Sequence, residues 1–159
     1  MMDLSKFLKQ KHVPFEKLAH RETFDAQHLA HELHISGHRI AKTVVLKTPE
    51  DGAYYVAVLP AAERICFELA SSLLNGKKVA LASEQEIAER FADCELGAVP
   101  PFGSLYGMKT LLERSLLEQP WIVFEGQTHH EAIRMRVDDF VRIESPVVGD
   151  IAIEPLPSQ

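Results

Sequence analysis

Three separated segments of the sequence contain residues that could bind and polarise a ligand. They are Lys42, the loop Gly97-Ala-Val-Pro-Pro-Phe-Gly103 and the turn Gly126-Gln-Thr-His-His130. A fixed ammonium can stabilise developing negative charge, and an imidazole can hold a polar group or a water molecule. Glycine lets main chain approach a ligand closely because it has no Cβ, while adjacent prolines stiffen the loop and exclude a helix. We therefore expect a rigid scaffold that presents this irregular wall to a ligand.

Motifs for covalent or metal-dependent hydrolysis are missing from the sequence. It contains no GxSxG elbow, no HExxH and no convincing Cys/His pair, so a covalent intermediate or a metal hydroxide is not supported. Cys66 and Cys94 lack CxxC spacing and are interpreted as small buried hydrophobic residues. His28, His31 and His34 resemble a metal cluster, but steps of three residues drift around a helix and no cysteine or acidic pair completes a tetrahedral set. A solvated helix face is favoured, and no metal or cofactor is expected.

Composition limits the class of protein. The 159 residues are 46% hydrophobic, which fits one compact domain. The net charge of −6 argues against a protein that coats long nucleic acid, although local cations could still grip a short RNA end. The candidates for that role are Lys42, Lys77, Lys78, Arg134 and Arg136. Because no signal-peptide-like run or apolar stretch of ~20 residues occurs, we expect a soluble, cytoplasmic protein without a membrane partner.

The elements that must position the three segments follow from periodicity and turn residues. Helices are predicted around Leu4–Lys11, over Ala26–Leu33, from Pro60 through Leu73, from a Ser83/Glu86 capping box through Phe91, and over Asp138–Ile143. Strands are predicted at Phe15–His20, Ile40–Lys47, Tyr54–Leu59, Lys78–Leu81, Met108–Leu112, Trp121–Glu125 and Ala132–Arg136, before a tail from Pro146 to Gln159. We expect an α+β fold in which helices flank a mixed, curved, barrel-like sheet of about six to seven strands.

Three motifs in this order resemble the YbaK/EbsC family of aminoacyl-tRNA deacylases, relatives of the editing domain of bacterial prolyl-tRNA synthetases. The motifs are Ile40-Ala-Lys-Thr-Val-Val, then the Gly97–Gly103 loop, then a glycine-led histidine turn that runs into Glu131-Ala-Ile-Arg-Met. The resemblance covers Phe15 to Ile143. It implies a single YbaK-like domain over residues 1–159, with a core at about 15–143. It also implies hydrolysis, without a metal, of the ester between a wrong amino acid and the terminal ribose of a tRNA.

The resemblance also suggests roles for Lys42 and the proline loop. From sequence alone, Lys42 is either a strand-end lysine that reaches solvent or a functional cation, because burying an unpaired ammonium is costly. The family favours a cation that meets the terminal phosphate or the ester carbonyl. Gly97 and Pro101 match the GxxxP pattern of the editing domain, and with Phe102 and Gly103 they are expected to bind substrate. The alternative for this loop is a purely structural turn.

The histidine turn is assigned in the same way. The Gly126 amide is expected to help form an oxyanion hole, with His130 as the catalytic imidazole. His129 competes for that role, but adjacent residues of an extended chain point to opposite faces, so only one should reach the pocket. The spacing from Gly126 favours His130, which leaves His129 as a surface residue or a second substrate contact. His20 and Thr23 are expected to border the same cleft.

The expected reaction is substrate-assisted. Water attacks the ester carbonyl, Lys42 and the Gly126 amide stabilise the oxyanion, and the free ribose hydroxyl acts as base or proton shuttle. The expected partner is the 3′ aminoacyl end of a tRNA that carries Ala, Ser, Cys or Pro, since small side chains escape a synthetase pocket most easily. An aminoacyl-tRNA synthetase is a further candidate partner, and the oligomeric state is left open. Two alternatives stay open: a non-catalytic module that binds a nucleotide or an aminoacyl-tRNA end, and a metal hydrolase that uses His28, His31 and His129 or His130.

Overall fold

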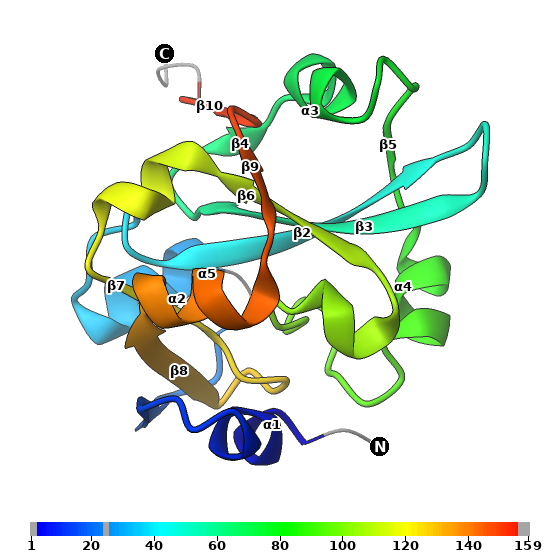
Figure 1. Cartoon of the computed structure of the whole chain (residues 1–159). Helices are drawn as coiled ribbons and strands as arrows, with labels where there is room; N and C mark the ends of the chain where they lie inside the picture. The colour runs from blue at the N-terminus through cyan, green and yellow to red at the C-terminus, as the bar shows by residue number, and fades with distance from the viewer. Residues whose placement is uncertain (1–2, 24–25, 156–159) are drawn as a thin grey trace.

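The computed structural model describes residues 3–23 and 26–155. Five α-helices occur in this part of the chain: α1 (Leu4–Gln10), α2 (Ala26–Leu33), α3 (Phe67–Leu73), α4 (Glu84–Arg90) and α5 (Val137–Glu144). Two 3-10 helices, η1 (Gly103–Tyr106) and η2 (Arg114–Glu118), flank a strand. In Figure 1, α1 lies beside β8 at one end of the molecule, while α3 lies at the other end near the C-terminal segment. None of the described helices has the length and apolar content needed to span a bilayer.

Most strands belong to two sheets. The five-stranded sheet has the order β5 (Ala80–Leu81), β2 (Ala41–Thr48), β3 (Ala53–Pro60), β6 (Lys109–Glu113) and β9 (Val147–Gly149). It is mixed, because β2 pairs antiparallel with β3 and β5, whereas β6 pairs parallel with β3 and β9. The second sheet is antiparallel, with the order β1 (Phe15–Ala19), β8 (Glu131–Arg136) and β7 (Trp121–Glu125). A small pair joins β4 (Arg64–Ile65) to β10 (Ala152–Ile153).

A single parallel bridge joins the two large sheets. Ile40, just before β2, pairs with Val123 of β7, and the Val123 N–H donates to the carbonyl of Arg39 at 3.1 Å. Both side chains are buried, and they pack in one cluster with Leu29 and Ala30 of α2. The strands β2 and β7 therefore begin side by side beneath α2 and then separate into different sheets.

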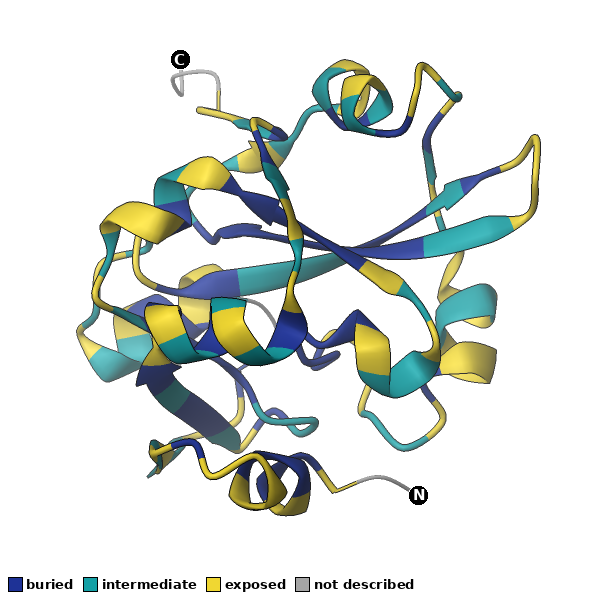
Figure 2. Cartoon of the chain, in the orientation of Figure 1, coloured by how far each residue is buried: buried dark blue, intermediate teal, exposed yellow. Residues whose placement is uncertain are grey.

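The main hydrophobic core lies between the two sheets, where Figure 2 shows buried residues along the central strands. Phe102 is at its centre, with edge-to-face contacts to Phe7, Phe124 and Phe140 at ring-centroid distances of 5.2–5.7 Å. Such pairs contribute about 0.5–1.5 kcal/mol each beyond the burial of apolar area. The residues that follow the proline loop thereby anchor it in the core.

The α+β class is confirmed, but three details of the prediction are wrong. The described residues form ten strands, in three sheets rather than one, and they contain no closed barrel because β2 and β7 diverge. The chain after Pro60 turns into β4 before α3 begins at Phe67. The predicted tail contains β9 and β10, strands of three and two residues that are too short to show a periodic pattern.

Candidate active site

A polar pocket opens where β2 and β7 separate. Lys42 and Glu125 each lie two residues beyond the Ile40–Val123 bridge. In-register residues of a parallel pair point to the same face, and strand side chains alternate, so both residues emerge on the α2 side at the same level. They line one pocket of about 180 Å³ together with Ala26, Ala41, Thr43, Gly97 and Val99. The structure thus brings together Lys42 and Gly97, which are 55 residues apart in the sequence.

An apolar pocket continues from the first along β2. It has a volume of about 330 Å³ and shares Thr43, Gly97 and Val99 with the polar pocket. Its remaining lining residues are Val44, Val45, Leu81, Ala82 and Ile87. Gly97 therefore lies between the polar pocket, which contains charged side chains, and the apolar pocket, which is lined by aliphatic side chains.

The Lys42 side chain is half-buried and reaches across the end of the β2–β3 hairpin. Its Nζ donates to the carbonyl oxygen of Ala61 at 3.4 Å, which is a long hydrogen bond. Lys47, on the same strand but an odd number of residues away, instead forms an ion pair with Glu86 at 2.8 Å, and this bond raises the pKa of Lys47. Alternation along one strand thus gives the two ammonium groups different surroundings.

His129 holds the loop that contributes Gly97. Its Nε2 lies 2.5 Å from the carbonyl oxygen of Leu96, and its backbone N–H donates to Oε2 of Glu95 at 3.1 Å. A carbonyl oxygen can only accept, so Nε2 carries the proton in this bond. The Leu96 carbonyl and the Gly97 N–H belong to one peptide group and point in opposite directions when the peptide is trans. By binding the carbonyl, His129 sets the direction of the Gly97 N–H.

Two main-chain donors of this loop are candidates for an oxyanion hole. Within the described part of the chain, no protein acceptor binds the N–H of Gly97 or of Val99, and both residues line the polar pocket. Gly97 has φ +86°, in the left-handed region that favours glycine. The predicted donor, Gly126, is already engaged, because its N–H donates to the carbonyl of Glu131 at 2.9 Å. The oxyanion role predicted for the Gly126 amide conflicts with this bond.

The exposures of the two histidines are the reverse of the expectation that His129 lies at the surface and His130 reaches the pocket. His129 is 6% exposed, whereas the His130 side chain is 60% exposed and lies 3.9 Å from Glu22. Gln127 has φ +76°, so the chain is not extended between Gly126 and the histidines, and the spacing rule does not apply. His129 also lies near Glu125, with 3.8 Å between Nδ1 and Oε1.

The end of the proline loop forms core rather than a ligand wall. Pro101 is buried, and Phe102 is 0% exposed among aromatic rings. The Gly103 N–H donates to Oγ1 of Thr110 at 2.9 Å, and a Cβ at this glycine would lie only 2.7 Å from the same oxygen. The structure therefore gives these three residues a packing role in place of the predicted substrate contacts. Gly97 and Val99 are the loop residues that reach the pocket.

His20 and Thr23 fasten the histidine turn from outside the pocket. The His20 N–H donates to the carbonyl of His130 at 3.0 Å, and the Thr23 N–H donates to that of His129 at 3.2 Å. Thr23 is buried, while Nδ1 of His20 lies 2.6 Å from the carbonyl oxygen of Arg21. Neither residue lines the polar pocket, so both hold the turn in place.

Glu125 is the site residue that sequence reasoning missed. It ends the strand Trp121-Ile-Val-Phe-Glu125 and is 7% exposed. A carboxylate at the buried end of an otherwise apolar strand is unusual, because burial of a charge is costly unless it is paired or hydrogen-bonded. That signal was present in the sequence, but the pairing of Ile40 with Val123 that places Glu125 beside Lys42 was not.

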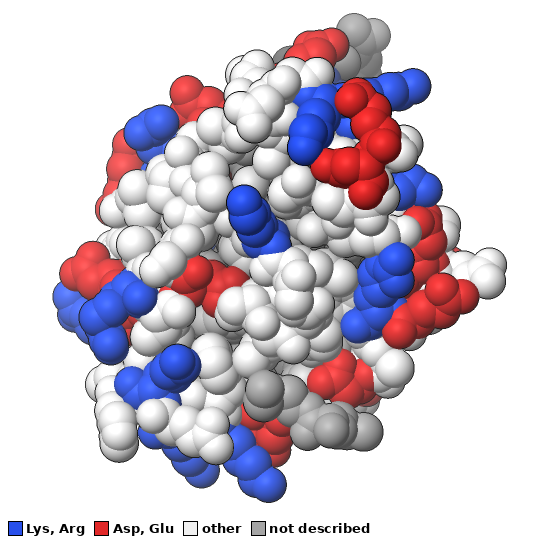
Figure 3. Space-filling model, turned by 45° about the vertical axis from the view of Figure 1, so that its right-hand side comes forward, with Lys and Arg blue, Asp and Glu red and all other residues white. Residues whose placement is uncertain are grey.

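His28 and His31 of α2 and His34 just after it are all exposed, in keeping with the solvated face that the sequence predicts. Among the described residues, the one group of at least three side chains positioned to hold a metal is His38, Glu63 and Glu154. It includes none of His28, His31, His129 or His130. Figure 3 shows basic and acidic side chains interspersed over one face of the molecule, without a continuous basic surface there.

Residues 20–143 match the aminoacyl-tRNA editing domain family. This match covers more than half of the chain, so the protein belongs to that YbaK-like family, as the sequence motifs indicated. Members of this family act on aminoacyl-tRNA. A comparison with curated proteins finds no match.

Solved structures share the fold. One, called hypothetical protein APE2540, has a TM-score of 0.87 at 22% identity and covers 96% of this chain and 100% of its own. A second, described as a proposed trans-editing enzyme for prolyl-tRNA synthetase, has a TM-score of 0.80 at 21% identity and covers 95% of each chain. A third, described as a proposed signal transduction protein from Marinobacter aquaeolei VT8, has a TM-score of 0.72 at 15% identity and covers 95% of this chain but 30% of its own. At these identities, the comparison shows the fold alone.

Proposed function

We propose that the protein is a trans-editing deacylase that hydrolyses the ester of tRNA mischarged with a small amino acid. The observation that carries this proposal is the convergence of Lys42, Glu125 and the Gly97 main chain on one pocket of about 180 Å³. Pockets that enclose drug-sized ligands measure about 300–1,000 Å³. A space below that range suits an aminoacyl group, with the terminal adenosine and the rest of the tRNA outside.

In this proposal the ester carbonyl points toward Lys42 and the loop amides. Water attacks the carbonyl carbon, and the negative charge that develops on oxygen is stabilised by the Lys42 ammonium and by the N–H groups of Gly97 and Val99. Preorganised donors of this kind lower the barrier because they need no reorientation during the reaction. The free hydroxyl of the terminal ribose accepts a proton from the attacking water while it passes its own proton to the neighbouring ester oxygen. The bond between the carbonyl carbon and that oxygen then breaks, which releases the free amino acid and leaves both ribose hydroxyls on the tRNA, so the protein supplies no covalent nucleophile.

Glu125 and His129 have different roles in the proposal. An aminoacyl ester has a free α-amino group, and Glu125 supplies the carboxylate that binds it in its ammonium form. His129 is a positioning residue, since its bond to the Leu96 carbonyl directs the Gly97 N–H. His130, at 60% side-chain exposure, stays a candidate for contact with the tRNA outside the pocket.

The walls of the apolar pocket bear on which small side chain is accepted. Binding alone separates amino acids that differ by one methylene by only ~1–3 kcal/mol, so a second, size-limited hydrolytic site corrects the errors of a synthetase. The apolar pocket is lined mainly by Val44, Val45, Leu81, Ala82 and Ile87. Within the predicted group of Ala, Ser, Cys and Pro, these aliphatic walls favour Ala and Pro.

The test is a deacylation panel with tRNAs that carry alanine, serine, cysteine or proline, run with and without a chelator. We expect chelator-resistant release of at least one of these amino acids, and a rate lower by about 10²–10³-fold in Lys42→Ala. Lys47→Ala is the matched control, because Lys47 lies on the same strand but binds Glu86. Binding of aminoacyl-tRNA without release would support a binding module instead, and release that requires a metal would support a metal hydrolase.

A further inference from the structure

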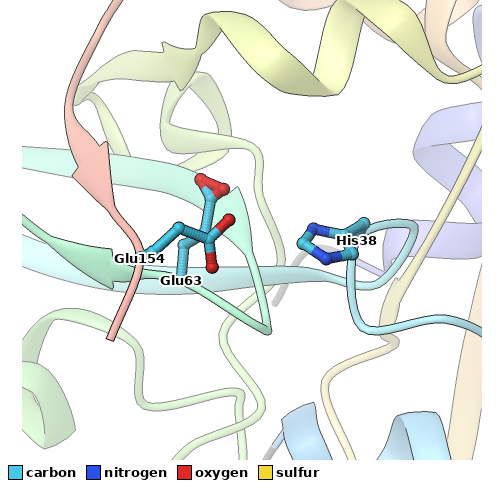
Figure 4. A group of neighbouring side chains, drawn as sticks. All are labelled: His38, Glu63 and Glu154. Atoms are coloured by element: carbon cyan, nitrogen blue, oxygen red, sulfur yellow. The ribbon is translucent and has the colours of Figure 1, made fainter. Parts of the chain in front are cut away.

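We propose that His38, Glu63 and Glu154 form a binding site for a divalent transition-metal ion of the Zn²⁺ class. One candidate ligand atom from each of these residues lies within 4.8 Å of the other two. Figure 4 shows the His38 ring turned toward the two carboxylates, with the three side chains arriving from separate segments. None of the three lines the polar pocket, so the ion would take no part in ester hydrolysis.

Main-chain contacts fix the spacing of the three segments. The loop of His38 is joined to the turn of Glu63 by a hydrogen bond from the Ala62 N–H to the Gly37 carbonyl at 3.2 Å. Gly37 permits this close approach, since a Cβ there would lie 3.2 Å from Cβ of Ala62. Glu154 directly follows β10, which pairs with β4 immediately after Glu63. The ligand set is therefore held by backbone pairing, although His38 and Glu154 are themselves exposed.

The three ligand atoms are close enough for one ion to bridge them after small side-chain movements. No ion pair within 4.0 Å involves His38, Glu63 or Glu154 among the described residues, yet their ligand atoms approach within 4.8 Å. Ligands at ~2.0–2.2 Å from a zinc ion are about 3–4 Å apart from each other. Small rotations of the exposed side chains would close the remaining gap.

Electrostatics also favour a cation at this place. The candidate ligand oxygens of Glu63 and Glu154 lie within 4.8 Å of each other. Two carboxylates placed this close repel each other, and a divalent ion would convert the repulsion into attraction.

The donor set selects the class of metal. One imidazole nitrogen with two carboxylate oxygens suits zinc and neighbouring transition metals, whereas Mg²⁺ and Ca²⁺ prefer oxygen ligands alone. Three protein ligands leave a fourth position for water. Such an ion would fasten Glu154, just after β10, to the loop that leads into β2, and hence to the strand of Lys42.

The experiment uses the full chain, stripped with a chelator, dialysed and titrated with ZnCl₂ by isothermal calorimetry without tRNA. We expect one ion per chain, a rise in Tm on binding and much weaker heats with MgCl₂. Glu63→Gln and His38→Ala should each lower the association constant at least roughly tenfold. The metal-free Tm and circular dichroism of each variant establish that it is folded.

The matched control is His34→Ala, which removes a histidine outside the cluster and should leave zinc affinity unchanged. Failure to bind zinc, or zinc binding that is equally strong in Glu63→Gln and in the native sequence, would overturn the proposal. The readout needs no deacylation, so a negative result here would not affect the proposed function, and inactivity toward tRNA would not affect this site.

Discussion

The imidazole of His129 binds the carbonyl of Leu96, with Nε2 2.5 Å from the oxygen, and thereby controls the peptide group that ends in the Gly97 N–H. This bond joins the turn after β7 to the loop across the pocket, beside the bonds from the His129 N–H to Oε2 of Glu95 and from the Glu95 N–H to the carbonyl of Gln127. If this bond is lost, the peptide can rotate, and the Gly97 N–H no longer has a fixed direction.

We therefore expect His129→Ala to lower kcat for deacylation by about 100-fold with a smaller change in KM, because a misplaced donor mainly affects the transition state. His129→Asn, which retains a side-chain N–H donor, should recover part of the loss. His130→Ala should stay close to the native rate. Single-turnover kinetics measure these differences, and equal losses in His129→Ala and His130→Ala would contradict the positioning role.

Gly97→Ala should reduce both activity and stability, whereas Gly52→Ala should reduce stability alone. Both glycines have left-handed backbones, with φ +86° and φ +69°, so each alanine costs about 1–2 kcal/mol in the free energy of unfolding. A methyl group added at Gly52 would meet only open space, while Gly97 lines the polar pocket. Urea denaturation and deacylation rates measure the two effects. Full activity in Gly97→Ala would argue against the loop as an oxyanion hole.

Glu125→Gln should weaken the recognition of a free α-amino group. The native protein is expected to prefer aminoacyl-tRNA over N-acetyl-aminoacyl-tRNA by about tenfold or more in kcat/KM, since a charge-assisted hydrogen bond contributes about 1.5–3 kcal/mol. In Glu125→Gln this preference should largely disappear through slower cleavage of the free-amine substrate. If the preference persists in the variant, Glu125 does not bind the amino group.

Cys94 should be alkylated slowly at neutral pH. Burial raises the pKa of its thiol to about 11, and the neighbouring charge of Asp93 adds to the shift, although a hydrogen bond with Tyr106 opposes it. A raised pKa retains the proton to higher pH, so the reactive thiolate is scarce at pH 7 and increases about tenfold for each pH unit up to that value. Iodoacetamide labelling of a Cys66→Ser variant, followed by mass spectrometry from pH 7 to 10, measures this rise. A rate that levels off near pH 8 would contradict it.

The sequence correctly predicted the helices and strands that are determined by neighbouring residues, such as capping residues and alternating hydrophobic residues. The capping box of Ser83 and Glu86 starts α4 as expected, with the Glu86 N–H donating to Oγ of Ser83 at 3.1 Å. The alternation of β2 and β3 likewise gave the hairpin. Even the meeting of Lys42 with the Gly97 loop followed from motif order, through the family resemblance rather than through periodicity.

Long-range pairing decided what the sequence could not show. Glu125 gains its place from the register of Ile40 with Val123, which lie 83 residues apart. The choice between His129 and His130 depended on the left-handed residue Gln127, a conformation that few non-glycine residues adopt. The strands β9 and β10 form because partner strands receive them, since two or three residues have no preference strong enough to be read alone.

The strands β2 and β7 meet at the bridge between Ile40 and Val123 and diverge from it, and the polar pocket lies between their diverging ends. Among the described residues, no second bridge joins β2 to β7, so the angle between the sheets sets how far Lys42 stands from Glu125. A small displacement at the Ile40–Val123 bridge would therefore produce a larger change in the separation of the two strands at the pocket. If the proposed function holds, conservative changes at the buried residues Ile40 and Val123 should change the size of the acyl group that is accepted, although neither residue lines the pocket.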